Sequence, residues 1–271
     1  MLTIDVAIVT YGPEGLKRVK QMLPSEREGV KYVVSWQFPG EKIIPEDLKK
    51  RKDVIVRFLE VPGVANNRNN AIDYCTGDII MIADDDIIYV DDFDSIVREA
   101  FENNPTVDVG IFKVKLAKEK IYPAEDCRIG VPFPKHYYVN NMELALRRKS
   151  LADLRYWPEL GIGASCLKAC EEEFLLISAI KRGLNCRFFN RTICSHPTPS
   201  TGDRAEPGIM KAMGFIIYTL YPFSFSVRVP LKAYRLSKSG KTTFLKSLLP
   251  MISGILFAMK NLKRIPRQYR W

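Results

Sequence analysis

The sequence predicts an α/β fold in which a mostly parallel β-sheet is flanked by helices. Short β-branched runs alternate with helical patterns through the first hundred residues, and the connections between them are short. The run at residues 4–10, IDVAIVT, is nearly all apolar, as expected for a strand that is covered on both faces. Because parallel strands are joined by right-handed crossovers, the alternation predicts helices packed against such a sheet.

The other elements are predicted from the same patterns. The helix at 63–75 should end before Gly77, since glycine is favoured just past a helix end. Residues 118–141 combine prolines, aromatic residues and charges, and a loop of that length in a compact domain is usually functional or mobile. Strands are predicted at 4–10, 31–36, 53–59, 78–83, 107–114 and 185–194, and helices at 16–23, 63–75, 91–102, 142–154 and 167–182.

Composition limits the class of protein. The chain has 271 residues and a formal net charge of +10, which favours an anionic partner such as nucleic acid, acidic lipid or a phosphorylated substrate. Six cysteines without a CxxC pair indicate reduced thiols in a cytosolic protein. A zinc site of Cys166, Cys170 and His196 is a less favoured alternative, because the spacing is irregular. The first residues lack a basic signal-peptide region, and no apolar run reaches the length of about 20 residues that spans a bilayer.

The last segment, residues 208–271, differs from the rest of the chain. Apolar blocks alternate there with basic ones, and no Asp or Glu occurs. This pattern favours a segment that lies on an anionic membrane surface, with apolar side chains among acyl chains and Lys and Arg among head groups. The alternatives are helices that pack on the core with a basic outer face, or a hairpin that binds a partner subunit.

Three adjacent carboxylates follow the buried run at 79–83. Asp84, Asp85 and Asp86 repel one another, and core packing does not require them. Ligands bind at the carboxyl ends of strands in open α/β sheets, so carboxylates at this position suit a hard divalent cation. The alternative is a solvated turn at the end of the strand, where Asp is common.

Two further groups are candidates for chemistry. The cluster NNRNN at 66–70 could present amides and the Arg68 guanidinium to a phosphate or a base, or its Asn residues could serve as helix caps. Three acids, Glu171, Glu172 and Glu173, begin a predicted helix; they either complement the helix dipole or supply a general base. His196 follows the last predicted strand and could complete a metal site with a neutral imidazole.

These pieces together resemble a family 2 glycosyltransferase of the GT-A fold, a Rossmann-like architecture. The resemblance covers residues 2–196 and consists of a first strand ending in Thr10-Tyr11, then VANNRNNAI, GDIIMIADDD, EEEFLL and a late histidine. Its most specific part is the pair RNNAI and GDIIMIADDD, in which ADDD matches the DxD motif. The resemblance departs from the family at the helix with the glutamates, where Cys170 replaces a glycine and Glu replaces Asp.

The resemblance implies roles for individual residues. A nucleotide-diphosphate sugar would bind with Mn²⁺ or Mg²⁺, and Glu172, or next Glu171, would be the general base. The implied metal ligands are Asp86, Asp84 and His196, and the implied donor-binding residues are Thr10, Tyr11, Arg68, Asn69, Asp84 and Asp85.

The resemblance therefore implies an inverting, metal-assisted glycosyltransferase. It would move a sugar from a UDP- or GDP-sugar to a glycan or lipid-linked acceptor, without a nucleic-acid partner, on the cytoplasmic face of the cell membrane. The expected organisation is a catalytic domain at 1–207, with a donor half at 1–116 and an acceptor half at 117–207, followed by the basic segment at 208–271, which could also mediate oligomerisation. One alternative is a sugar-phosphate nucleotidyltransferase, which needs a more glycine-rich loop than TYGPEGLKR; another is a non-catalytic protein that binds membranes or nucleic acid.

Overall fold

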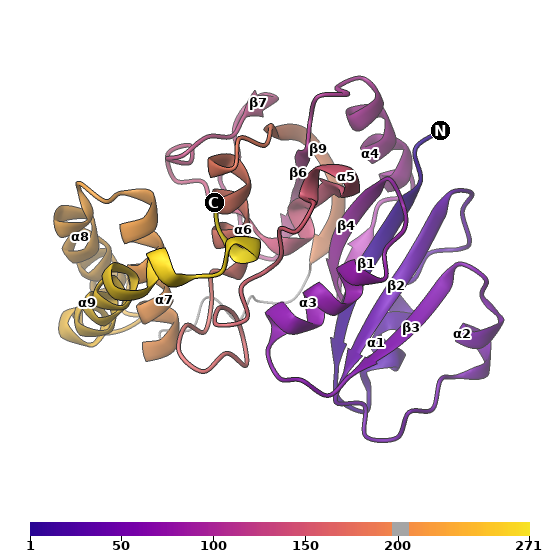
Figure 1. Cartoon of the computed structure of the whole chain (residues 1–271), viewed down its shortest axis with the longest axis horizontal. Helices are drawn as coiled ribbons and strands as arrows, with labels where there is room; N and C mark the ends of the chain where they lie inside the picture. Colours follow the sequence, from indigo (N-terminus) through magenta and orange to yellow (C-terminus); the bar gives the residue numbers. More distant parts are fainter. Residues whose placement is uncertain (197–205) are drawn as a thin grey trace.

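The fold was analysed in a computed structural model that describes residues 1–196 and 206–271. Its centre is a nine-stranded sheet in which β1–β4 run parallel to one another (Figure 1). The four parallel strands are β1 (Ile4–Tyr11), β2 (Val30–Gln37), β3 (Val54–Leu59) and β4 (Ile79–Asp84). The strand order is β3-β2-β1-β4-β8-β6-β9-β5, so β1 and β4 lie side by side in the sheet and their carboxyl ends meet at one edge.

The second half of the sheet is mixed. Strand β8 (Leu144–Arg147) runs antiparallel to β4 and to β6 (Val109–Leu116), whereas β9 (Cys186–His196) runs parallel to β6. The short strands β5 (Ile88–Tyr89) and β7 (Cys127–Arg128) both pair with β9.

The predicted helix at 142–154 was wrong. That stretch forms the short helix η1 (Asn141–Glu143), the strand β8 and the single-turn helix α5 (Arg148–Leu151). The apolar residues of LALR are buried because two neighbouring strands flank them, and this pairing with residues distant in the sequence outweighs the helical preference of Leu and Ala.

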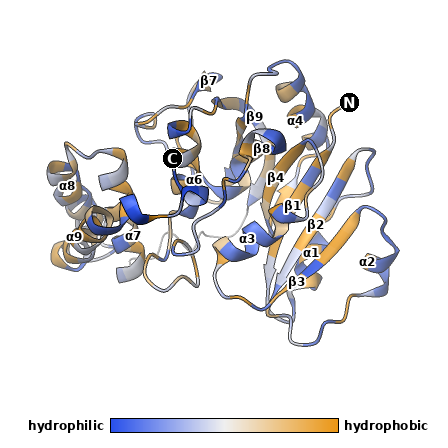
Figure 2. Cartoon of the chain, in the orientation of Figure 1, coloured by the Kyte–Doolittle hydropathy of each residue, from blue (hydrophilic) through white to orange (hydrophobic). Residues whose placement is uncertain are grey.

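The sheet separates two hydrophobic cores. Alternate residues of one strand point to opposite faces, so that in β4 Ile80 joins one core and Met81 the other. Helices α3 (Val64–Asp73) and α6 (Glu171–Lys181) contribute to the first core, and α1 (Gly15–Met22) and α4 (Phe93–Glu102) to the second. The five-residue helix α2 (Glu46–Lys50) leads into β3. The predicted α/β fold is thus confirmed, and Figure 2 shows apolar residues concentrated in the central strands.

Three helices form the last segment of the chain. Helices α7 (Pro207–Leu220), α8 (Phe225–Lys238) and α9 (Phe244–Asn261) gather at one end of the molecule (Figure 1). The short helices η3 (Leu262–Arg264) and η4 (Arg267–Tyr269) then return the chain to α6, where the Trp271 ring lies 6.2 Å from Phe174. Within the described part of the chain, no helix has the length and apolar character needed to cross a membrane.

Candidate active site

A cleft of about 350 Å³ opens where the carboxyl end of β4 meets α3 and the amino-terminal end of α6; Thr10 and Tyr11 of β1 do not line it. Its walls also include residues from η1 and from the start of α7. The chemically active side chains that line it are those of Arg68, Asp84, Asp85, Asp86, Glu171, Glu172 and His196. The structure therefore brings together most of the predicted site residues, which come from elements far apart in the sequence.

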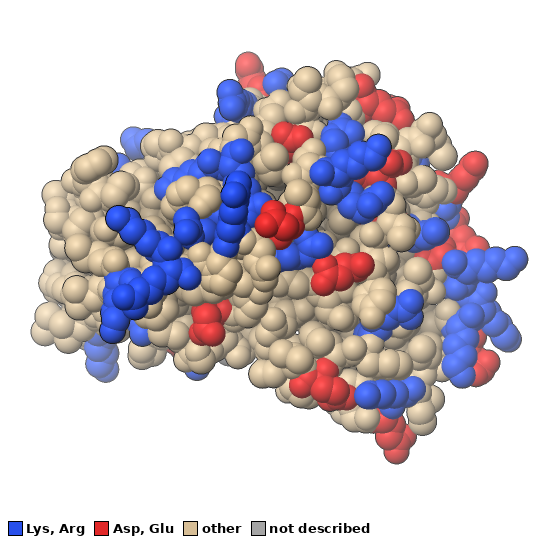
Figure 3. Space-filling model, in the orientation of Figure 1, with Lys and Arg blue, Asp and Glu red and all other residues tan. Residues whose placement is uncertain are grey.

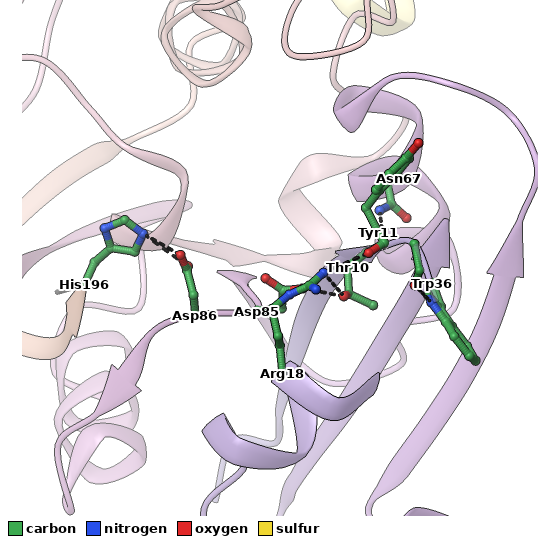
Figure 4. Close-up of polar contacts among 9 residues, drawn as sticks. Thr10, Tyr11, Arg18, Trp36, Asn67, Asp85, Asp86 and His196 are labelled. Atoms are coloured by element: carbon green, nitrogen blue, oxygen red, sulfur yellow. Dashed lines mark hydrogen bonds and ion pairs between the residues drawn. The ribbon is translucent and has the colours of Figure 1, made fainter. Parts of the chain in front are cut away.

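The Asp85 carboxylate faces β1 (Figure 4). It accepts hydrogen bonds from the Thr10 hydroxyl and from Arg18 Nε, the latter at 2.8 Å. Arg18 also donates to the Tyr11 carbonyl at 2.8 Å, and Asn67 donates to the Thr10 carbonyl at 3.0 Å. Burial raises the pKa of Asp85, although the bonds from Thr10 and Arg18 oppose that rise. This network fixes the end of β1 relative to the acidic triplet.

The Asp86 carboxylate points the other way, toward β9 (Figure 4). His196 Nε2 lies 3.1 Å from Asp86 Oδ2. Strand β4 ends at Asp84, and the next two carboxylates face different partners, as consecutive side chains of an extended chain do. A carboxylate and an imidazole that converge in this way are suitable donors for Mn²⁺.

The described residues contain no group of three or more His, Cys, Asp and Glu side chains arranged to hold a metal ion. This finding disfavours the zinc alternative, whose Cys166 thiol instead accepts a hydrogen bond from Lys211 Nζ at 2.8 Å. It also means that a cation at Asp86 and His196 would need further ligands from a substrate or from water. Such incomplete protein shells are usual for Mg²⁺ in sites that bind phosphates.

Arg68 joins the acidic triplet to the glutamate helix. Its guanidinium donates to Asp84 Oδ1 at 2.9 Å and to Glu171 Oε1 at 2.7 Å, and its side chain is 5% exposed. Burial opposes the charge of Arg68, but Asp84 and Glu171 outweigh that effect and raise its pKa. Both carboxylates are thus held by one buried cation, with Asn141 donating to Glu171 at 3.4 Å as well.

The three glutamates of α6 have different environments. Glu171 is occupied by Arg68, whereas Glu172 lines the cleft and its Oε2 has no hydrogen-bond partner among the described residues. Burial, together with the charges of Glu171 and Glu173, raises the pKa of Glu172 well above its usual value. Burial and the charge of Glu171 raise the pKa of Glu173 to about 7, but Glu173 does not line the cleft. Only Glu172 therefore combines an unpaired carboxyl oxygen with a place in the cleft.

Cys170 precedes these glutamates in a left-handed backbone conformation, with φ of +70°. Glycine adopts this conformation without cost, whereas a residue with a Cβ does not. The position where the resemblance expects glycine therefore keeps the backbone geometry of a glycine. The backbone therefore enters α6 in the direction that a glycine at this position would give, although Cys170 carries a side chain.

The loop before η1 is anchored by a buried ion pair. Lys120 Nζ contacts the Glu143 carboxylate, which also accepts hydrogen bonds from Tyr122 at 3.0 Å, Tyr137 at 2.9 Å and Asn140 at 3.1 Å. Burial raises the pKa of Glu143 and lowers that of Lys120. Because Asn140 also lines the cleft, this network fixes one wall of it.

Asn69 lies apart from the cleft. Its side-chain amide donates to the Tyr156 carbonyl at 2.8 Å and accepts from the Tyr156 backbone amide at 2.9 Å. The polar atoms of Asn69 therefore fix the backbone at Tyr156. Sequence reasoning did not single out Arg18, which contacts Asp85, or Asn141 and Lys168, which line the cleft. No local pattern distinguishes these three residues from ordinary surface residues.

The comparisons with known proteins are consistent with this geometry. Residues 40–161 match the family model described as Glycosyl transferase family 2. A fragment of S. aureus TarS, residues 1–349, superposes with a TM-score of 0.62 at 16% identity, over 94% of this chain and 81% of that one. The same fragment with UDP-GlcNAc gives a TM-score of 0.59 at 15% identity, over 98% and 78% of the two chains, and with UDP 0.58 at 17%, over 89% and 72%. No curated protein matches the chain.

The match over residues 40–161 confirms the predicted resemblance to family 2 glycosyltransferases. The matched range contains Arg68 and the acidic triplet, but it ends before Glu171 and His196. The likeness to TarS confirms the GT-A type of fold.

Proposed function

We propose that this chain transfers a sugar from a UDP-sugar to an acceptor hydroxyl with inversion at the anomeric carbon. The observation that carries the proposal is the position of Glu172 in the same cleft as Asp86 and His196. A carboxylate on one side of the bound sugar and cation ligands on the other are what an in-line displacement needs.

The donor would bind across the ends of β1 and β4. Tyr11 is 62% exposed at the end of β1, where its ring meets Phe38 edge-on at 6.0 Å, and its exposed side could stack on a nucleobase. Thr10 and Asp85 are already oriented by the network with Arg18 and could contact the ribose through small rearrangements. UDP is the favoured nucleotide, because TarS, which shares this fold, was crystallised with UDP and with UDP-GlcNAc.

Asp86 and His196 would hold Mn²⁺ or Mg²⁺, with the diphosphate and water supplying the remaining ligands. A cation bound there would neutralise the charge that develops on the leaving diphosphate. Asp84 lies beside this position, but its carboxylate accepts a hydrogen bond from Arg68. We therefore assign Asp84 mainly to orienting Arg68, with direct metal contact as a secondary role.

Glu172 would accept the proton of the acceptor hydroxyl. A general base works best when its pKa approaches the working pH, and burial beside Glu171 and Glu173 moves the pKa of Glu172 in that direction. Arg68 neutralises Glu171, so that a second negative charge next to the base is partly compensated. Glu171 is thus proposed as a positioning residue and Glu172 as the catalytic base.

The acceptor is proposed to be a glycan or a lipid-linked precursor in polysaccharide biosynthesis at the cytoplasmic face of the membrane. In this assignment residues 1–116 bind the donor, residues 117–207 supply the base and the acceptor wall, and residues 208–271 form the membrane-facing part. Residues 197–205 of the acceptor half lie outside the described residues.

The test is a thermal-shift panel of UDP, GDP, CDP and their sugars, each with and without Mn²⁺. We expect a rise in Tm with UDP or a UDP-sugar that depends on Mn²⁺, since ligand binding to the native state stabilises it. A chain that gives no rise with any nucleotide would contradict the proposed donor site. Release of UDP from the stabilising UDP-sugar on addition of acceptor glycans would then identify the reaction.

A further inference from the structure

The outward sides of α8 and α9 are apolar. In α9 the exposed residues recur with the period of one helix face, and in α8 a shorter stripe does the same. The turn before α8 adds Phe223, which is completely exposed. We name these residues the outer apolar face: Phe223, Val227, Leu231, Tyr234, Leu245, Leu249, Ile252, Leu256 and Met259. They are half of the eighteen large exposed apolar residues found among the described residues, although they lie within a stretch of 37 residues.

A basic stripe runs beside the outer apolar face. In α8, Arg228, Lys232 and Arg235 each follow an exposed apolar residue by one position, so they form a parallel stripe rotated by about 100° around the helix. Burial lowers the pKa of Lys232, so the two arginines carry most of the charge of this stripe. Residues 207–271 contain twelve Lys and Arg and no Asp or Glu. Figure 3 shows Lys and Arg gathered over the C-terminal helices, while the outermost end of this region is largely uncharged in that view.

From this arrangement we propose that the outer apolar face inserts into the head-group region of an anionic membrane, with the basic stripe contacting the lipid phosphates. This proposal deepens the membrane location given under the proposed function and rests on it. Apolar side chains next to Lys and Arg suit the boundary between acyl chains and anionic head groups. The alternative expectation, a basic outer face over core-packed helices, does not describe these helices, because their outer side is apolar.

Charge favours a membrane over a second copy of this chain. A symmetric dimer through the outer apolar face would bring the same surface of both copies together. Each surface carries basic residues and no acidic ones, so the two would repel each other. An anionic bilayer supplies both the apolar interior and the opposite charge.

The outer apolar face is rigidly connected to the cleft. Helices α7 and α9 cross at Gly214 and Gly254, where a Cβ on either glycine would lie 2.0 Å or less from a carbonyl oxygen of the other helix. Helix α7 also contributes Ile209 to the cleft, and its Gly208 carbonyl accepts a hydrogen bond from the Lys168 amide at 3.2 Å. A membrane bound by α8 and α9 would therefore hold the cleft at a fixed position relative to the lipid, which suits an acceptor that is itself anchored in the bilayer.

The test uses the full chain and sedimentation with vesicles of phosphatidylcholine alone or with phosphatidylglycerol in equal parts. We expect binding to the mixed vesicles, and a loss of at least about tenfold in affinity for the double variant Leu249→Ser, Leu256→Ser, because two apolar side chains leave the lipid. The matched control is Ile43→Ser, Ile121→Ser. These residues are 65% and 61% exposed, against 62% and 61% for Leu249 and Leu256, and they lie outside the C-terminal helices.

A second pair of variants tests the basic stripe. Arg228→Gln, Arg235→Gln should lower the affinity for mixed vesicles by about thirtyfold, since each basic residue near an anionic surface contributes about 1 kcal/mol. The control Lys31→Gln, Lys52→Gln removes two exposed charges far from the stripe and should change little.

Donor binding separates this proposal from the proposed function. Variants that lose vesicle binding but keep the Mn²⁺-dependent rise in Tm with UDP would support both. Wild-type protein that shows this rise and does not sediment with either vesicle would overturn the membrane proposal alone. A dimer in light scattering that Leu249→Ser, Leu256→Ser converts to a monomer, without vesicle binding, would overturn it in favour of a second copy.

Discussion

The structure predicts that Arg68→Gln destabilises the fold much more than an ordinary surface charge change. Arg68 is 5% exposed, and its partners Glu171 and Asp84 are 9% and 29% exposed. Removing one partner of a buried ion pair leaves the other charge uncompensated, which costs about 3–5 kcal/mol. Because Asp84 can be hydrated, we expect a loss near the lower limit, about 3 kcal/mol. At about 2–4 °C per kcal/mol, Tm should fall by about 6–12 °C.

Thermal unfolding followed by circular dichroism measures this effect. The matched control is Lys42→Gln, which removes the exposed pair with Glu60 and should cost less than about 1 kcal/mol. The double variant Arg68→Gln, Glu171→Gln should be more stable than the sum of the single changes predicts, by about 1–3 kcal/mol, because it leaves no charged Glu171 behind. If Arg68→Gln melts as the control does, the buried bridge does not carry the stability that we assign to it.

The same variant has a second readout. Arg68 lowers the pKa of Glu172, so its removal should raise that pKa further. A base is inactive when protonated, and the pH at which activity appears should therefore move upward in Arg68→Gln.

Three other predictions follow from the site and the fold. Asp86→Asn should abolish the Mn²⁺-dependent rise in Tm with UDP while far-UV circular dichroism stays unchanged, whereas Asp91→Asn, an exposed acid nearby, should retain the rise. Glu172→Gln should keep donor binding, while the rate of sugar transfer falls by about 10²-fold or more. In the wild type, kcat should fall as the pH drops through the raised pKa of Glu172. A flat pH profile would argue against Glu172 as the base. Ala152→Gly should raise the free energy of unfolding by about 1 kcal/mol in a denaturant titration, because Ala152 has φ of +47°. Ala152 lies in an exposed turn in which the Leu154 amide donates a hydrogen bond to the Leu151 carbonyl. An unchanged midpoint would show that no strain is relieved.

Sequence patterns predicted the parallel strands β1 to β4 because the signals are local there. The runs at β1, β2 and β4 are short and mostly apolar, and their length and flanking turn residues distinguish buried parallel strands from helices. The same reasoning failed at β8. Its four residues carry no period that separates strand from helix, and only the flanking strands β4 and β6 make it extended.

The sequence by itself determined that three carboxylates end a buried strand and that three glutamates begin a helix. Only the tertiary structure decided how each is used. Arg68 binds Glu171, 103 residues away in the sequence, which leaves Glu172 unpaired in the cleft. His196 contacts Asp86, 110 residues away in the sequence. Identical side chains differ only through the charges and the burial that surround them after folding. No local pattern contains that information, because the partners come from other elements of the sheet.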